Sequence, residues 1–120
     1  MSIELIDEQA ASTFLDAARS MAKAIHRRAG EKGWWETERN DFELIALLHS
    51  ELSEAVESLR RGNPPSDKIP AFSAAEEKLA DCLIRIADTA HARGWDVAGA
   101  LVAEMADNAE RPQRHGEKLA

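Results

Sequence analysis

The sequence has a single cysteine, Cys82, among 120 residues. One cysteine cannot form a disulfide within the chain, and it is too few for a zinc site built on thiolates. No apolar run is long enough to cross a bilayer, and no basic N-terminal segment precedes an apolar stretch. These absences argue against a secreted or membrane protein and favour a reducing, cytoplasmic location.

An excess of basic residues is also missing, because 15 Lys and Arg face 22 Asp and Glu, for a net charge of −7. A protein that binds nucleic acid polymers generally needs a basic surface. We therefore expect no nucleic acid and no membrane as a partner. Small phosphorylated ligands are compatible with this charge, because a metal ion can bridge an acidic side chain to a phosphate.

The alternating apolar pattern of a β-strand is absent, and apolar residues recur every three or four positions instead. This spacing predicts four helices, over residues 7–29, 40–61, 73–93 and 96–109. Gly30 and Gly33 are expected to end the first helix, and a connector rich in proline and polar residues fills 62–72. Asn40 and Ser73 each precede a glutamate by three residues, which is typical of a helix start.

These elements predict one all-α, four-helix domain over residues 1–120, with 1–30 as the first helix and 111–120 as a tail. The expected buried face of the second helix consists of apolar residues at helical spacing: Phe42, Ile45, Leu48, Leu52, Val56 and Leu59. A chain this short buries a modest core, so dimerisation is expected to complete the bundle.

Two acidic clusters lie within these apolar stretches. Glu51 and Glu54 are three residues apart, and Glu77 and Asp81 are four apart, so each pair shares one face of a helix. Carboxylates at apolar borders are costly to bury unless a cation compensates them. If the two faces meet, they form an all-oxygen site suited to Mg²⁺ or Mn²⁺; otherwise the acids are solvated surface residues.

Four segments then follow in order: KGWW at 32–35, HSELSEA at 49–55, LADCLIRIAD at 79–88 and NAERPQRHG at 108–116. With them, residues 33–118 resemble the MazG-like, all-α nucleoside triphosphate pyrophosphohydrolase family. The resemblance implies a helical homodimer or homotetramer. It also implies Mg²⁺-dependent cleavage of (deoxy)nucleoside triphosphates to monophosphate and pyrophosphate.

The resemblance also assigns roles to residues of this chain. It implies catalytic and metal-binding roles for Glu51, Glu54 and Asp81. It implies phosphate contacts for Asn108 and Arg111, and a position near the base for Trp34 or Trp35. The alternative for either tryptophan is packing of the loop, and Arg85 is either a phosphate ligand or a neutralising partner of an aspartate.

One departure from the family pattern is Lys78, which stands where the family has an acid. Three consequences are open. Glu77 supplies the missing metal ligand, three acids hold the metal alone, or the Lys78 ammonium occupies the metal position and contacts phosphate in a non-catalytic binder. The sequence thus predicts a nucleotide pyrophosphohydrolase. A non-catalytic phosphate-binding oligomer and a purely structural oligomer are the alternatives.

Overall fold

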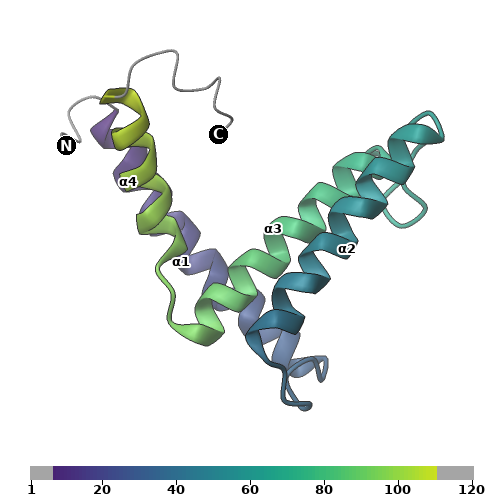
Figure 1. Ribbon diagram of the computed structural model, residues 1–120, viewed down its shortest axis with the longest axis horizontal. Coiled ribbons are helices and arrows are strands. Elements are labelled where there is room, and N and C mark those ends of the chain that lie inside the picture. Colours follow the sequence, from purple (N-terminus) through teal and green to yellow (C-terminus); the bar gives the residue numbers. More distant parts are fainter. Residues whose placement is uncertain (1–6, 111–120) are drawn as a thin grey trace. The chain divides into compact units, whose positions relative to one another are not determined.

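The computed structural model describes residues 7–110, which form four helices (Figure 1). The helices are α1 (Glu8–Glu31), α2 (Asp41–Arg60), α3 (Ala74–Arg93) and α4 (Val97–Glu110). Within the described residues there is no strand, and the one β-bridge joins Pro65 to Ser73. The predicted all-α class with four helices is confirmed.

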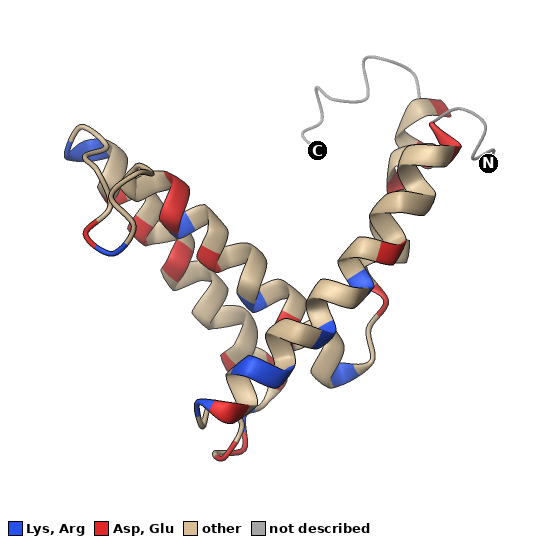
Figure 2. Cartoon of the chain, turned by 180° about the vertical axis from the view of Figure 1, so that it is seen from behind, with Lys and Arg blue, Asp and Glu red and all other residues tan. Residues whose placement is uncertain are grey.

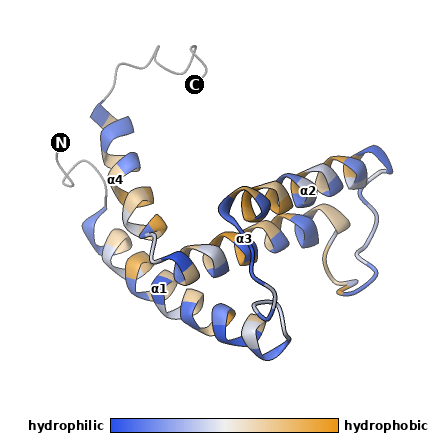
Figure 3. Ribbon diagram, turned by 60° about the horizontal axis from the view of Figure 1, so that its bottom comes forward, coloured by the Kyte–Doolittle hydropathy of each residue, from blue (hydrophilic) through white to orange (hydrophobic). Residues whose placement is uncertain are grey.

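The chain divides into two units, made of residues 22–95 and of residues 1–21 with 96–120. In the first unit α2 and α3 lie side by side as an antiparallel pair, joined by the connector 62–72 (Figures 1 and 3). In the second unit the Arg19 guanidinium pairs with Asp96 at 3.0 Å, and Ala106 of α4 is fully buried.

Local capping explains where the helices begin. The Asn40 side chain accepts the backbone N–H of Glu43, and Ser73 forms a complete capping box with Glu76. Asp96 accepts the Gly99 N–H in the same manner before α4. Because the first N–H groups of a helix have no partner within it, these side-chain acceptors fix each start.

Helix ends follow the glycines with one exception. Gly94 adopts the left-handed conformation (φ 71°) that closes α3, as glycine allows without a steric cost. Gly30 does not end α1 as expected, because the helix continues to Glu31 and the left-handed glycine is Gly33, with φ 89°. The last helical hydrogen bond runs from the Lys32 N–H to the Arg28 carbonyl, and the turn follows it.

Most of the buried apolar residues are small. The fully or nearly buried apolar side chains are Ala11, Leu44, Ala55, Ala74, Ala75, Cys82, Ala90, Val102 and Ala106. The expected buried face of α2 is wrong for the single chain: Phe42 is 88 % exposed and Leu59 60 % exposed, whereas Leu44 is 3 % exposed. The reason is that the buried residues of α2, which are Leu44, Ala55 and Ser58, share a neighbouring face of the helix, so the larger side chains of the expected face are left uncovered within the single chain.

Hydrophobic residues occur on all four helices, interrupted throughout by hydrophilic ones (Figure 3). Among the helices of residues 7–110, none combines the length and the apolar character that a bilayer crossing requires.

The capping box at Ser73 gives a first prediction. Ser73→Ala removes the acceptor for the Glu76 N–H and should lower the free energy of unfolding by about 1 kcal/mol. Urea unfolding followed by circular dichroism, at one fixed protein concentration, measures this. Ser53→Ala, at an exposed position inside α2, is the control and should change stability little. An equal loss in both variants would contradict the capping role.

Candidate functional site

An open cleft of about 800 Å³ lies in the unit formed by residues 22–95. Its walls come from the end of α1 and the turn after it, from α2 and α3, and from Lys68 of the connector. Three of the predicted acids, Glu51, Glu54 and Asp81, line it. Six cationic side chains line it as well: Arg28, Lys32, Arg39, Lys68, Lys78 and Arg85.

The cleft therefore holds more positive than negative side chains, although the chain as a whole is acidic. Acidic and basic residues are interspersed along the α2–α3 pair (Figure 2). A cleft with this local excess attracts anions more strongly than the net charge of the chain indicates. Sequence reasoning did not single out Arg39 or Lys68, because only the fold brings the segment after α1 and the connector to the acids.

Glu51 on α2 and Asp81 on α3 are close enough for their negative charges to repel each other. Burial raises the pKa of the Glu51 carboxyl, and the nearby charges of Asp81 and Glu54 raise it further, against the opposing effect of Lys78 and Arg85. Within the described part of the chain, neither Glu51 nor Asp81 has an ion pair or a side-chain hydrogen bond. Of the three acids that line the cleft, these two are therefore the ones without an ion-pair partner among the described residues.

Glu77 has a different environment. The residue is 7 % exposed, its Oε1 accepts a 2.5 Å hydrogen bond from Ser66 Oγ, and its Oε2 lies 3.1 Å from the Lys68 ammonium. Oε2 forms ion pairs but accepts no well-directed hydrogen bond. The Ser66 hydrogen bond, followed by Lys68, lowers the pKa of Glu77 from 4.5 to about 2. Of the four predicted metal ligands, Glu77 is the one outside the cleft lining.

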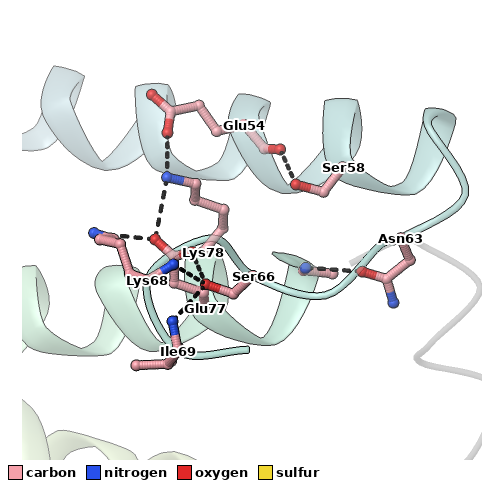
Figure 4. A network of polar contacts seen from close by, with 9 residues as sticks. Glu54, Ser58, Asn63, Ser66, Lys68, Ile69, Glu77 and Lys78 are labelled. Atoms are coloured by element: carbon pink, nitrogen blue, oxygen red, sulfur yellow. Dashed lines mark hydrogen bonds and ion pairs between the residues drawn. The ribbon is translucent and has the colours of Figure 1, made fainter. Parts of the chain in front are cut away.

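Lys78 connects the two helices (Figure 4). Its ammonium lies 2.9 Å from Glu54 Oε1 on α2 and 3.5 Å from Glu77 Oε2 on α3. The interaction with Glu54 raises the pKa of Lys78, so the side chain is a permanent cation at neutral pH.

The two predicted tryptophans have separate environments. The Trp34 ring lines the cleft, with the guanidinium carbons of Arg39 and Arg85 at 3.9 and 3.6 Å from its centroid. Both guanidinium groups therefore lie within cation–π distance of the same indole. Arg39 is also bonded to the Trp34 carbonyl and to Glu43. The Arg85 guanidinium has no hydrogen bond or ion pair with another residue of the range 7–110.

Trp35 belongs to a buried polar cluster instead. Its Nε1–H donates to both carboxylate oxygens of Asp88 at 3.1 and 3.2 Å, and its ring packs on His26. Asp88 is 2 % exposed and also accepts a 2.7 Å bond from His26 Nδ1. These contacts satisfy a buried carboxylate and fix α1 and the aromatic turn to α3. No local sequence signal connects His26 to Asp88, since 62 residues separate them.

The remaining predicted residues lie elsewhere. Asn108 is an exposed residue of α4 and belongs to the unit of residues 1–21 and 96–120. Arg111 falls outside the described residues. The cleft as described therefore contains neither of the two residues expected to contact phosphate from the C-terminal segment.

Within residues 7–110, no group of three or more His, Cys, Asp and Glu side chains is arranged to hold a metal ion. The environments of the four acids explain this result. Lys78 pairs with Glu54, while Ser66 and Lys68 hold Glu77, so two of the four carboxylates are already engaged with other groups.

Comparisons of the chain with family models, with curated proteins and with solved structures gave no match.

The environment of Glu77 predicts a pH dependence of stability. A carboxyl whose pKa falls from 4.5 to about 2 on folding stabilises the protein above pH 4.5. This contribution is lost as pH falls from 4.5 toward 2, because the unfolded chain takes up the proton first. Glu77→Gln should lower stability at neutral pH, and its deficit relative to the wild type should shrink below pH 4.5.

Chemical denaturation at a series of pH values measures that difference. Glu57→Gln, at an exposed position of α2, is the matched control and should follow the wild-type curve. A Glu77→Gln deficit that stays constant from pH 7 to acid would contradict the assignment.

Proposed function

We propose that the chain is a Mg²⁺-dependent pyrophosphohydrolase, with Mn²⁺ as an alternative, that cleaves (deoxy)nucleoside triphosphates to monophosphate and pyrophosphate in the cytoplasm. The observation that carries this proposal is the single cleft that joins Glu51, Glu54 and Asp81, from two helices, with six cationic side chains. Carboxylates suit a hard divalent cation, and lysine and arginine suit the phosphates that such a cation accompanies.

The donor set fits a divalent cation that two carboxylates and several waters hold, and to which substrate phosphates add further ligands. Mg²⁺ commonly binds one or two carboxylates, several waters and substrate phosphates, and does not need a complete protein cage. Glu51 and Asp81, which lack ion pairs within residues 7–110, are the residues that would hold it, with Glu54 beside them. Such a cation neutralises charge on a phosphoanhydride.

The side chains of the cleft bind and orient the rest of the ligand. Arg85 presents a guanidinium that has no ion pair or hydrogen bond to residues 7–110, and the Trp34 face holds its plane in place. A guanidinium oriented in this way can donate two parallel hydrogen bonds to a phosphate. We infer that Trp34 positions Arg85 and Arg39, rather than stacking directly on a base.

A second candidate function is favoured by one contact. The Lys78 ammonium pairs with Glu54 at 2.9 Å, which places a fixed positive charge on one of the three cleft acids. With that charge in place, the cleft can bind a polyphosphate through cations alone. The second candidate is therefore a phosphate-binding protein without hydrolysis.

Turnover distinguishes the two functions. With Mg²⁺ or Mn²⁺, the wild type should release pyrophosphate from at least one member of a panel of nucleoside triphosphates. Asp81→Asn should reduce the rate by at least about tenfold, because it removes one of two cation-binding carboxylates. Coupled detection of pyrophosphate measures this, with Asp67→Asn in the exposed part of the connector as the control.

Triphosphate binding without pyrophosphate release would contradict the pyrophosphohydrolase and support the phosphate-binding protein. Release that is equal in the wild type and in Asp81→Asn would assign the activity to a contaminant.

We further propose that the protein is a homodimer or homotetramer. Large apolar side chains are exposed on every helix of the single chain, and the most exposed are Phe42, Leu83, Met21, Leu59, Phe72, Met105 and Leu79. Monomeric proteins rarely leave so many large apolar groups in water, and symmetric self-association is the commonest way to cover them.

Substitution at one exposed position tests the association. Leu83 lies on α3 and is 68 % exposed, so the Leu83→Glu variant should still fold. Its oligomer should have a lower mass than that of the wild type. Light scattering after size exclusion should give two or four times the chain mass for the wild type and less for the variant. His49→Glu adds the same charge on α2 without removing apolar surface and should keep the wild-type mass. A monomeric wild type at all concentrations would exclude the oligomer.

A further inference from the structure

The four acids of the two clusters divide into two unlike pairs. Glu54 and Glu77, from α2 and α3, are bridged by the Lys78 ammonium at 2.9 and 3.5 Å (Figure 4). A cation shared between carboxylates of two helices reduces their repulsion, as a metal ion in the same place would. The difference is that an ammonium is attached to the chain and cannot leave.

The bridged pair is held from a second side as well. Glu77 is 7 % exposed and receives the Ser66 hydroxyl at 2.5 Å and the Lys68 ammonium at 3.1 Å. Ser66 is itself buried and accepts the backbone N–H groups of Lys68 and Ile69, so the connector is folded around the carboxylate. Binding a metal at Glu77 would require breaking contacts on both oxygens.

The second pair, Glu51 and Asp81, lines the open cleft and has no ion pair or side-chain hydrogen bond to any residue between 7 and 110. Water can reach both carboxylates in an open cleft. A cation that binds here displaces solvent alone and breaks no protein contact. The two pairs therefore differ in what a divalent cation would have to displace.

We propose that Lys78 is a built-in cation for Glu54 and Glu77, so that the cleft takes one exchangeable divalent cation, at Glu51 and Asp81, and Glu77 is not a metal ligand. This inference rests on the proposed function, because it concerns the same cleft. It makes Lys78 a specificity-determining residue that sets the number of cations, through repulsion between its ammonium and a second divalent ion.

Mn²⁺ titration without nucleotide tests the inference independently of turnover. Electron paramagnetic resonance counts free Mn²⁺, and calorimetry gives stoichiometry. The wild type should bind one Mn²⁺ per chain, Asp81→Asn should lose this binding, and Glu77→Gln should keep it. Lys78→Gln should bind Mn²⁺ about tenfold more tightly or take a second ion, because Glu54 is released and a nearby positive charge is removed.

Lys32→Gln is the matched control, because Lys32 lines the same cleft and forms no ion pair with residues 7–110. It removes the same charge without releasing a carboxylate, and its effect should be clearly smaller than that of Lys78→Gln. Circular dichroism confirms the fold of each variant. Should Glu77→Gln fail to fold, the comparison of Lys78→Gln with Lys32→Gln decides alone.

Two Mn²⁺ ions in the wild type, loss of binding in folded Glu77→Gln, or equal effects of Lys78→Gln and Lys32→Gln would overturn the inference. None of these results touches the proposed activity. One bound Mn²⁺ with no pyrophosphate release would overturn the proposed activity and leave the inference standing.

Discussion

The ion pair between Lys78 and Glu54 is the constraint on which the cleft depends. The Lys78 ammonium of α3 lies 2.9 Å from Glu54 Oε1 of α2, and this contact joins the two helices beside their acidic residues. Without a cation there, four carboxylates on two packed helices would repel one another, and the repulsion would be strongest where burial lowers the local dielectric. The ammonium relieves part of that repulsion, because it lies close to Glu54 on α2 and to Glu77 on α3, and the two helices can then pack against each other.

The connector between α2 and α3 is part of the same arrangement. Ser66 and Lys68 bring a hydroxyl and an ammonium to the buried Glu77, and Asn63, in the left-handed conformation, accepts the Ala75 N–H with its side chain. A buried charge is tolerated only where such partners are present. Glu77 therefore links the conformation of the connector to α3, and its contacts stabilise the fold.

Local sequence signals predicted the helices and their boundaries. They did not predict contacts between residues that are far apart in the sequence. The caps at Asn40 and Ser73 and the glycine at 94 marked helix boundaries because capping depends on residues three or four positions apart. Helical spacing also placed Glu51 and Glu54 on one face. Neither signal connects Ser66 with Glu77 or His26 with Asp88, since those bonds depend on how separate segments fold back. The apolar face of α2 was recognisable, but periodicity does not say which surface covers it.

The pair Glu54 and Glu77 shares the Lys78 ammonium, whereas Glu51 and Asp81 have no such partner among residues 7–110. An ammonium attached to the chain stabilises the ligand-free cleft at every metal concentration, whereas an exchangeable cation stabilises it only by mass action. If the proposed function holds, the same ammonium would repel a second divalent ion and attract phosphate. Under that proposal, Lys78 would reduce the capacity of the cleft for metal while retaining its attraction for an anionic ligand. Among the three acids that line the cleft, Glu51 and Asp81 are the two without an ion pair to residues 7–110.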